Sequence, residues 1–311
     1  MRQTSIGIDV AKDNLDAYRR PAGDARRFPN TNAGRQALIR WIGGDVARVV
    51  FEPTGRYGKP LERALHAADL PAIKVNPWQA RRYAEAAGQR AKTDPIDAAM
   101  LAEMGDALQL APQPKPCEAV ETLKELAVAR LALVKDRTAA KNRQKQLTAP
   151  LLRRQNAMRL RQIERDLKAV DDAIKAVIAD HPELARRADI LESIPGLGPA
   201  TAAALIAEMP ELGTIDAKAA AALAGLAPMT RQSGRTQRRA RIQGGRAQLR
   251  QALYMPALVA ARYNSDLKRV YERLVNAGKP KKLAVTAIMR KLIVLANALI
   301  AQDRKWAESP P

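Results

Sequence analysis

Two carboxylates lie three positions apart in the segment AKTDPIDAAML, residues 91–101. Asp94 followed by Pro95 is typical of a helix start, with aspartate as the N-cap and proline at the first helical position. Positions i and i+3 also share one helix face, so oxygens of Asp94 and Asp97 can hold one hard cation. The helix start and the metal site are compatible, and the pair alone does not decide between them.

Two further acids stand where predicted strands end. Asp9 closes the apolar run SIGID, and Glu52 closes the run VVFE. Side chains at neighbouring strand ends of an α/β sheet converge on one crevice. With a helix beginning at Asp94 packed beside them, four carboxylates would meet. Their repulsion favours a bound divalent cation, Mg²⁺ or alternatively Mn²⁺.

Such a carboxylate site predicts phosphoryl-transfer chemistry. Two metal ions about 4 Å apart would stabilise the attacking and leaving oxygens of an in-line displacement. Each acid also has a simpler interpretation, with Asp9 as a turn former and Glu52 as a surface residue. Glu52 is harder to explain in that way, because a charge that ends an apolar strand needs a partner.

Composition indicates the class of partner. The 311 residues include 53 Lys and Arg against 32 Asp and Glu, a net charge of +21 that favours nucleic acid. Only 4% aromatic residues argue against a membrane-surface helix, and the apolar run at 292–300 is shorter than a bilayer requires. One cysteine and two histidines exclude a disulfide framework, a zinc ribbon and a histidine-rich metal site. Without an apolar signal-peptide core at the N-terminus, we expect a soluble, cytoplasmic protein.

Residues 1–110 predict alternating strands and helices. β-Branched runs predict strands at 4–10, 47–52 and 70–76, and apolar periodicity predicts helices at 34–42 and 60–70. The polar, alternating segments 13–20 and 24–30 predict a hairpin behind the first strand. We therefore expect an α/β domain in which the first three strands are antiparallel and βα units follow.

The proline-rich segment APQPKP at 111–116 predicts a linker, followed by a helical middle region to residue 185. A 3-4-3-4-3 spacing of apolar residues there predicts a coiled-coil or helical-hairpin seam, with an ordinary bundle helix as the alternative. The seam consists of Leu160, Ile163, Leu167, Val170, Ile174 and Val177.

The C-terminal region, 186–311, is almost wholly helical in pattern. LESIPGLGPATAAALIAEM at 191–209 has the form of a helix-hairpin-helix element, whose turn would direct backbone N–H groups at a phosphate. Any tight turn between helices carries similar glycines, so a packing turn is the alternative.

The segment RQSGRTQRRARIQGGRAQLR at 231–250 carries seven arginines and no acid. Such a segment can neutralise a phosphate backbone, and a solvated loop is the alternative. The predicted nucleic-acid contacts are Arg231, Arg235, Arg238, Arg239, Arg241, Arg246 and Arg250. Ser233 and Gly234 lie within this segment, where composition alone favours a turn.

Several blocks in order resemble the DEDD-type insertion-sequence transposases, the family that includes the Piv DNA invertase and the bridge-RNA-guided recombinases. The N-terminal blocks are GIDVAKDNLD (7–16), FEPTGRYG (51–58) and KTDPIDAAMLAE (92–103). The C-terminal blocks are ESIPGLG (192–198), AAALAGLAP (220–228), RQSGRT (231–236) and LRQALYMPALVA (249–260). The resemblance covers nearly the full chain.

This resemblance implies an RNase H-like (Holliday-junction-resolvase-like) domain at 1–110 and a mostly α-helical transposase domain at 186–311. It implies a metal-binding catalytic tetrad, which in this sequence consists of Asp9, Glu52, Asp94 and Asp97. It also implies that Ser233 attacks DNA and forms a covalent phosphoserine link. No histidine lies near Ser233 in the sequence, which favours activation by metal, and Thr230 and Thr236 stay open as alternative nucleophiles.

The resemblance further implies a prokaryotic enzyme that acts at the nucleoid, cleaving and rejoining donor and target DNA under the guidance of a structured bridge RNA. It implies homodimers that assemble into a tetramer, with the seam at 160–177 as a dimer element. One alternative is a junction-resolving nuclease that uses only the tetrad, with Ser233 as a phosphate contact. The other is a non-catalytic nucleic-acid-binding protein in which the acids serve as caps and strand ends.

Overall fold

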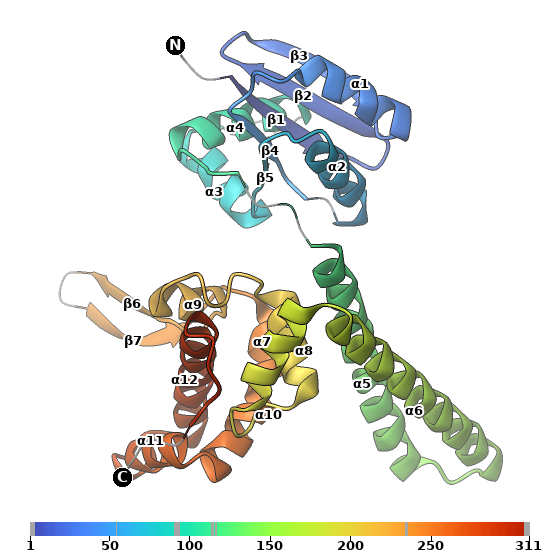
Figure 1. The fold of residues 1–311 in the computed structure, drawn as a ribbon, viewed down its shortest axis with the longest axis vertical. Coiled ribbons are helices and arrows are strands. Elements are labelled where there is room, and N and C mark those ends of the chain that lie inside the picture. Colours follow the sequence, from blue (N-terminus) through green and yellow to red (C-terminus); the bar gives the residue numbers. More distant parts are fainter. Residues whose placement is uncertain are drawn as a thin grey trace. The chain divides into compact units, whose positions relative to one another are not determined.

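The computed structural model describes residues 4–307 except 54, 90–93, 113, 114, 116, 234 and 235. The side chains of Arg56, of Asp94 and of residues 231–239 also lie outside the description. The chain forms two compact units, residues 1–115 and 116–311 (Figure 1). Helices from the predicted middle region, 111–185, belong to the second unit.

The first unit is built on a five-stranded mixed sheet with the strand order β3-β2-β1-β4-β5. The strands β1 (Ser5–Val10), β2 (Asn14–Arg20) and β3 (Asp24–Pro29) are antiparallel, which confirms the predicted arrangement and hairpin. The strands β4 (Arg48–Phe51) and β5 (Ala72–Lys74) run parallel to β1. This topology is compatible with the RNase H-like domain that the resemblance implies.

Successive residues of β1 point alternately to the two faces of the sheet. Ile6 and Ile8 are fully buried in a core shared with α1 (Asn32–Ile42) and α2 (Gly55–Ala67). On the other face, Gly7 touches α4 (Asp94–Ala107), and a Cβ there would lie 1.9 Å from the Ala98 carbonyl oxygen. Only glycine therefore allows this close approach of helix and strand.

Two helices of the first unit differ from expectation. The helix α2 begins at Gly55, ahead of the predicted start at 60, and includes Pro60. Pro60 is the sixth residue of this helix, so the helix lacks the hydrogen bond that an N–H at this position would donate four residues back. The helix α3 (Pro77–Ala86), with Asn76 as N-cap, was not predicted and packs its buried Ala80 into a cluster with residues of α4. The helix start at Asp94 is confirmed, while the Asp94 side chain that would cap it is not described.

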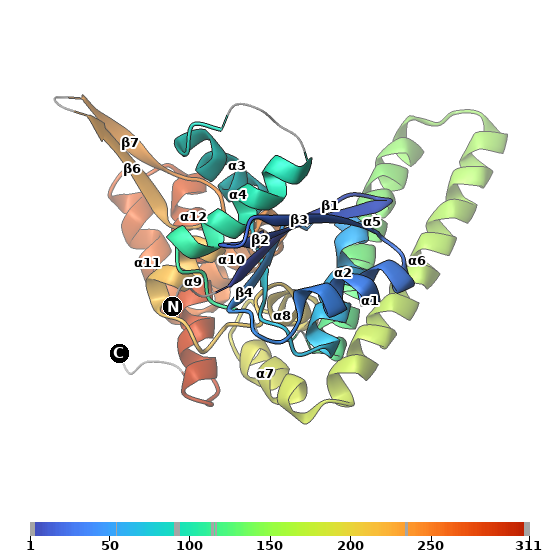
Figure 2. The same ribbon diagram turned by 90° about the horizontal axis from the view of Figure 1, so that it is seen from above.

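In the second unit, α5 (Glu118–Gln146) and α6 (Pro150–Ala179) form an antiparallel pair (Figure 2). The Asn156 amide joins the two helices, donating to the Ala140 carbonyl oxygen at 3.0 Å and the Gln144 Oε1 at 2.7 Å. Leu167 and Ile174, two residues of the predicted seam, are 5% exposed.

The role of this seam as a dimer element stays a prediction. Within the protomer, Ile174 belongs to the core of its own unit, and Val170 and Val177 pack against that core. The chain folds back at 147–149, while Leu160 and Ile163 are half-buried. Supercoiling of the pair stays a prediction.

The remaining helices of the second unit share one core. They are α7 (Pro182–Glu192), α8 (Pro199–Glu208), α9 (Ala217–Leu223), α10 (Ala247–Tyr263), α11 (Ser265–Asn276) and α12 (Lys281–Ala301). The turn between α7 and α8 buries Ile194 and Leu197 in that core. Packing thus accounts for the apolar residues of the turn, and its contact with phosphate stays a prediction.

The helix α12 is longer than the run at 292–300 that it contains. It spans 21 residues, and an 18-residue window of it has a mean hydropathy of 1.9, so by length and composition alone it could cross a membrane. In this fold half of that apolar window is buried in the protein. Leu292 and Ile293 lie in the core, as expected for a central core helix, which meets the same criteria.

A β-hairpin interrupts the predicted helical pattern. It consists of β6 (Pro228–Ser233) and β7 (Thr236–Ile242), and it projects from the helices of its unit (Figures 1 and 2). The predicted pattern, almost wholly helical for this region, did not include these two strands. Proline opens the first strand, and Gly244 and Gly245 follow the second, so neither end can continue a neighbouring helix.

Candidate active site

The register of β1 and β4 brings two predicted acids together. Ile8 pairs with Phe51 in the parallel ladder, so the next residues, Asp9 and Glu52, come side by side. Both stand at the carboxyl ends of their strands, where ligands bind in sheets of this kind. The register therefore supports a shared edge for these two strand ends, and their role as metal ligands stays a prediction.

The helix α4 brings its first turn to the same edge because it runs antiparallel to β1. At the start of the strand, the Ser5 hydroxyl donates to Asp106, close to the end of α4. Further along, Gly7 touches the backbone of Ala98. Asp9, two residues beyond Gly7 on the same face, therefore lies toward the end of α4 that carries Asp94 and Asp97.

Glu52 lies on this face as well. A Cβ at Gly105 of α4 would lie 2.6 Å from a methyl carbon of Val50, which identifies the face of β4 that α4 covers. Glu52 follows Val50 by two residues and so continues that face. The backbone thus places all four predicted acids at one end of the contact between the sheet and α4.

The side chains define the site less completely. Asp9, Glu52 and Asp97 are half-buried, and the Asp94 side chain is not described. Among the described side chains, no group of three or more His, Cys, Asp or Glu residues lies close enough to hold a metal ion. The four-carboxylate metal site therefore stays a prediction that the backbone supports.

Asn30 ties together the two loops that flank these acids. Its side-chain amide donates to the Ala11 carbonyl oxygen at 3.0 Å and to the Tyr57 carbonyl oxygen at 3.3 Å. Arg35 in turn donates to the Asn30 Oδ1 at 2.9 Å. Ala11 follows the strand of Asp9, and Tyr57 lies in the helix that follows Glu52. Asn30 was not predictable from the sequence, since an asparagine ahead of a helix cap carries no distinguishing signal.

A separate polar cluster occupies the opposite end of the same face. The Asp106 carboxylate lies 3.8 Å from the Arg20 Nε and 3.7 Å from an Arg48 Nη atom. Burial, followed by the neighbouring Glu103 carboxylate, raises the pKa of Tyr83 above its ordinary value. The acids of this cluster, Glu103 and Asp106, form ion pairs with arginines.

Ser233 is the last residue of β6 and pairs with Thr236 at the closed end of the hairpin. Thr230 lies in the same strand and is exposed. The structure describes only the backbone of Ser233, so it does not distinguish the serine from the two threonines as nucleophile. Four of the predicted arginine contacts, Arg231, Arg235, Arg238 and Arg239, likewise have no described side chain.

Two arginines of the basic segment hold the base of the hairpin. Arg246 donates to the Glu208 carbonyl oxygen at 2.6 Å and forms an ion pair with Glu211. Arg250 donates to the Gly244 carbonyl oxygen at 2.7 Å. The fold thus already engages both guanidinium groups, and their contact with phosphate stays a prediction, as it does for the exposed Arg241.

Arg246 also sets the charge of its partner. Burial alone would raise the pKa of Glu211. The hydrogen bond from Arg246, a backbone hydrogen bond and the nearby Lys124 outweigh burial and hold that pKa below its ordinary value. The carboxylate is therefore ionised near neutral pH and anchors the arginine.

A close backbone contact fixes the two ends of the hairpin. Gly225 precedes β6 and Gly245 follows β7, and both have positive φ angles, 67° and 66°. A Cβ on Gly245 would lie 2.2 Å from the Gly225 nitrogen. Both glycines are thus required where the hairpin leaves the helices, a role that the sequence analysis did not assign to them.

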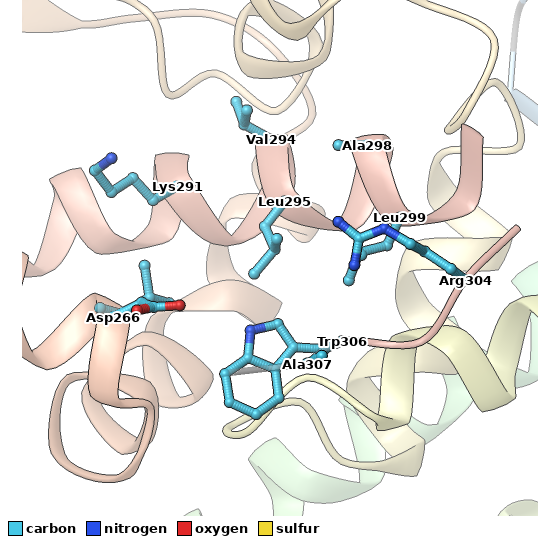
Figure 3. Close-up of a pocket in the computed structure, with 10 residues that line it drawn as sticks. Asp266, Lys291, Val294, Leu295, Ala298, Leu299, Arg304, Trp306 and Ala307 are labelled. Atoms are coloured by element: carbon cyan, nitrogen blue, oxygen red, sulfur yellow. The ribbon is translucent and has the colours of Figure 1, made fainter. Parts of the chain in front are cut away.

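A cavity of about 340 Å³ in the second unit lies apart from these residues. It is bordered by α11, α12 and the chain after α12, with Leu295 and Trp306 among its lining (Figure 3). The Trp306 backbone N–H donates to the Ser193 hydroxyl oxygen at 2.8 Å, which holds this last segment in place. None of the predicted site residues lines the cavity.

Comparisons with known proteins identify the family. A family model for the DEDD domain of IS110 elements, described as a transposase, matches residues 6–150. A second model, described as the transposase IS116/IS110/IS902 family, matches residues 188–272. The pilin gene-inverting protein of Moraxella bovis is 33% identical over 323 residues, covering 98% of both chains. The chain belongs to the IS116/IS110/IS902 transposase family.

Other relatives agree with this assignment. The pilin gene-inverting protein of Moraxella lacunata is also 33% identical over 98% of both chains. An uncharacterised 44.8 kDa protein of the insertion element IS116 from Streptomyces clavuligerus is 33% identical over 150 residues, 47% of this chain and 38% of that protein. This transposase is therefore a DNA strand-transfer enzyme, and DNA is its substrate.

The family also bears on the metal. DEDD-type transposase domains typically depend on a divalent metal ion. In this transposase, the groups at the end of β1 and β4 are carboxylates, whose oxygens suit a hard divalent cation. The residue types at this edge thus fit the metal that the family implies.

Proposed function

We propose that this transposase cleaves and rejoins DNA through a covalent phosphoserine intermediate at Ser233. The acids Asp9, Glu52, Asp94 and Asp97 would hold a divalent cation, Mg²⁺ or alternatively Mn²⁺. The main support is the register that sets Asp9 beside Glu52 at the end of the sheet where α4 begins. When bound, the cation would stabilise negative charge on the reacting phosphate oxygens.

In the cleavage step, the Ser233 oxygen bonds to the phosphorus of a phosphodiester. The bond from phosphorus to the leaving deoxyribose oxygen breaks, the serine proton is lost to a base or to water, and the leaving oxygen gains a proton. The position of Ser233 at the tip of a projecting, arginine-rich hairpin favours contact with a DNA backbone.

Rejoining reverses the same step with a new partner. A deoxyribose hydroxyl of another strand attacks the phosphoserine, and the Ser233 oxygen leaves with a proton. The bond energy is kept in the protein–DNA link, so strands can be exchanged without an external energy source. Keeping the bond energy in the protein–DNA link suits an enzyme that exchanges strands, whereas hydrolysis would release free DNA ends.

We further propose that a structured bridge RNA selects donor and target DNA, and that the protein acts at the nucleoid in the cytoplasm. The excess of basic residues, 53 against 32 acidic ones, permits binding of RNA as well as DNA. Homodimers that assemble into a tetramer would hold the strands to be exchanged. The seam at 160–177 stays the predicted contact between protomers.

The DEDD domain favours a second candidate, a metal-dependent nuclease that resolves junctions by attack of water. In that reaction the acids do all the chemistry, and Ser233 is a contact to phosphate. The two candidates differ in one product, because only the serine mechanism leaves protein attached to DNA.

Denaturing electrophoresis tests the proposal, with end-labelled DNA, Mg²⁺ and the RNA that co-purifies with the protein. Wild type should give slow bands that disappear after protease treatment, and Ser233→Ala should give none. Thr236→Ala is the matched control, since Thr236 pairs with Ser233 at the same hairpin tip, and it should keep the adduct. Free-ended products from Ser233→Ala would exclude the serine mechanism and support the nuclease.

A further inference from the structure

A fifth acid lies in line with the predicted metal ligands. Asp16 of β2 pairs directly with Asp9 of β1 in the antiparallel ladder. Residues opposite each other in such a pair have Cβ atoms about 5 Å apart on the same face of the sheet. Asp16 is 5% exposed, which makes it one of the few buried charged residues in the described chain.

Independent contacts fix the face on which Asp16 lies. Arg20, four residues along β2, forms ion pairs with Glu103 and Asp106 of α4. With a period of two along the strand, Asp16 shares that face. Asp16 therefore lies under the helix that carries Asp94 and Asp97, at the same end of the sheet as Asp9.

The Asp16 carboxylate is only half satisfied by the described residues. The Nε of Arg27, its partner on β3, donates to the Oδ1 at 2.8 Å. The Oδ2 atom is buried and has no hydrogen-bond partner in the part of the chain that the structure describes. A buried acceptor of this kind, next to a second carboxylate, is unfavourable unless something else binds it.

We propose that Asp16 is a fifth carboxylate of the metal site. Arg27 holds its Oδ1 in place and leaves the Oδ2 to the cation, or to a water molecule that the cation carries, beside Asp9. Mg²⁺ and Mn²⁺ keep several waters when bound by carboxylates, so both contacts suit the site. The inference rests on the proposed metal site, and it adds a ligand from a strand that the tetrad does not use.

A purely structural role is the alternative, in which Asp16 only anchors Arg27. Arg27 is 54% exposed at its side chain, so solvent satisfies much of its guanidinium. It needs no buried partner, and anchoring leaves the buried Oδ2 unexplained. A cation accounts for both the burial of Asp16 and its unsatisfied oxygen.

Mn²⁺ binding to the full-length protein without DNA tests the inference, measured by isothermal titration calorimetry. Asp16→Asn keeps the size of the side chain and removes its charge. It should weaken Mn²⁺ binding about tenfold, as loss of supporting groups at metal sites does. Asp106→Asn is the matched control, because Asp106 also pairs with arginines on this face but lies at the other end of α4. Its affinity for Mn²⁺ should equal that of wild type.

The outcomes separate this inference from the proposed function. If Asp9→Asn weakens Mn²⁺ binding and Asp16→Asn does not, Asp16 is structural and the tetrad stands. If wild type binds no Mn²⁺, both the inference and the proposed metal site fail. Should Asp16→Asn fail to fold, the double variant Asp16→Asn with Arg27→Gln restores a neutral hydrogen-bonded pair. Wild-type affinity in that variant would also overturn the inference.

Discussion

Replacing Gly7 by alanine adds one methyl group at the contact between β1 and α4. The new Cβ would lie 1.9 Å from the Ala98 carbonyl oxygen and 2.5 Å from the Ala102 nitrogen. Carbon and oxygen atoms ordinarily approach to about 3.4 Å, so α4 must move away by about 1.5 Å. Both obstructing atoms belong to the backbone, and no side-chain rotation can relieve the clash.

This displacement should lower the free energy of unfolding by about 3 kcal/mol, the upper end of the usual effect of overpacking. For a unit of 115 residues, the entropy of unfolding converts that loss into a decrease in Tm of about 12 °C. The same movement carries the first turn of α4 away from Asp9. Strand cleavage should therefore fall even at temperatures where Gly7→Ala is folded.

Differential scanning calorimetry of the full-length protein measures the effect on the transition of the first unit. Gly44→Ala is the matched control, since a Cβ there meets no atom within 4 Å, and its Tm should stay within about 1 °C of wild type. A Gly7→Ala variant with unchanged Tm would refute the direct packing of α4 on β1. It would also remove the argument that places Asp94 and Asp97 beside Asp9.

Three further predictions address charge. Asp9→Asn should abolish Mg²⁺-dependent strand cleavage. It should also remove the increase in Tm that Mg²⁺ causes in the wild-type protein. Normal cleavage by this variant would exclude Asp9 from the site. Replacing Arg238 and Arg239 together by Gln should lower the slope of log affinity for DNA against log salt by about two units, whereas an unchanged slope would place both in solvent. The pKa of Glu211 is lower in the folded state than in the unfolded state. Its carboxylate therefore stabilises the fold at pH values above its ordinary pKa. This contribution is lost as the pH falls through the lower pKa of the folded state. Thermal melts should show Glu211→Gln less stable than wild type at pH 7, with a difference that shrinks as pH falls below the ordinary pKa of the carboxylate, and a constant difference would exclude the ionised pair with Arg246.

Local signals determined much of the first unit. Short β-branched runs identified β1 and β4, and polar alternation identified the hairpin of β2 and β3. The sequence Asp-Pro predicted the start of α4 at Asp94, because both residue types act through their own backbone geometry. The acids at the strand ends were also predictable, since they stand directly after apolar runs.

Several predictions failed or stopped short because they depended on contacts between distant residues. The β6–β7 hairpin forms in a segment whose surroundings are helical, and it is closed by the contact of Gly225 with Gly245. Part of the seam at 160–177 is buried because α6 packs against α5 and the core of its own unit, which the spacing of apolar residues does not specify. A period of apolar residues predicts a face that must be covered, but not which element covers it.

In the candidate site, too, some features follow from the sequence and others only from the tertiary structure. The sequence by itself determined the residue types, four acids with a basic segment and a serine, and therefore the class of chemistry. Only the tertiary structure decided that Asp16 lies beside Asp9 and that Arg246 is engaged by Glu211. Strand register and helix packing bring together residues that are distant in the chain, and neither is encoded by the local pattern around those residues.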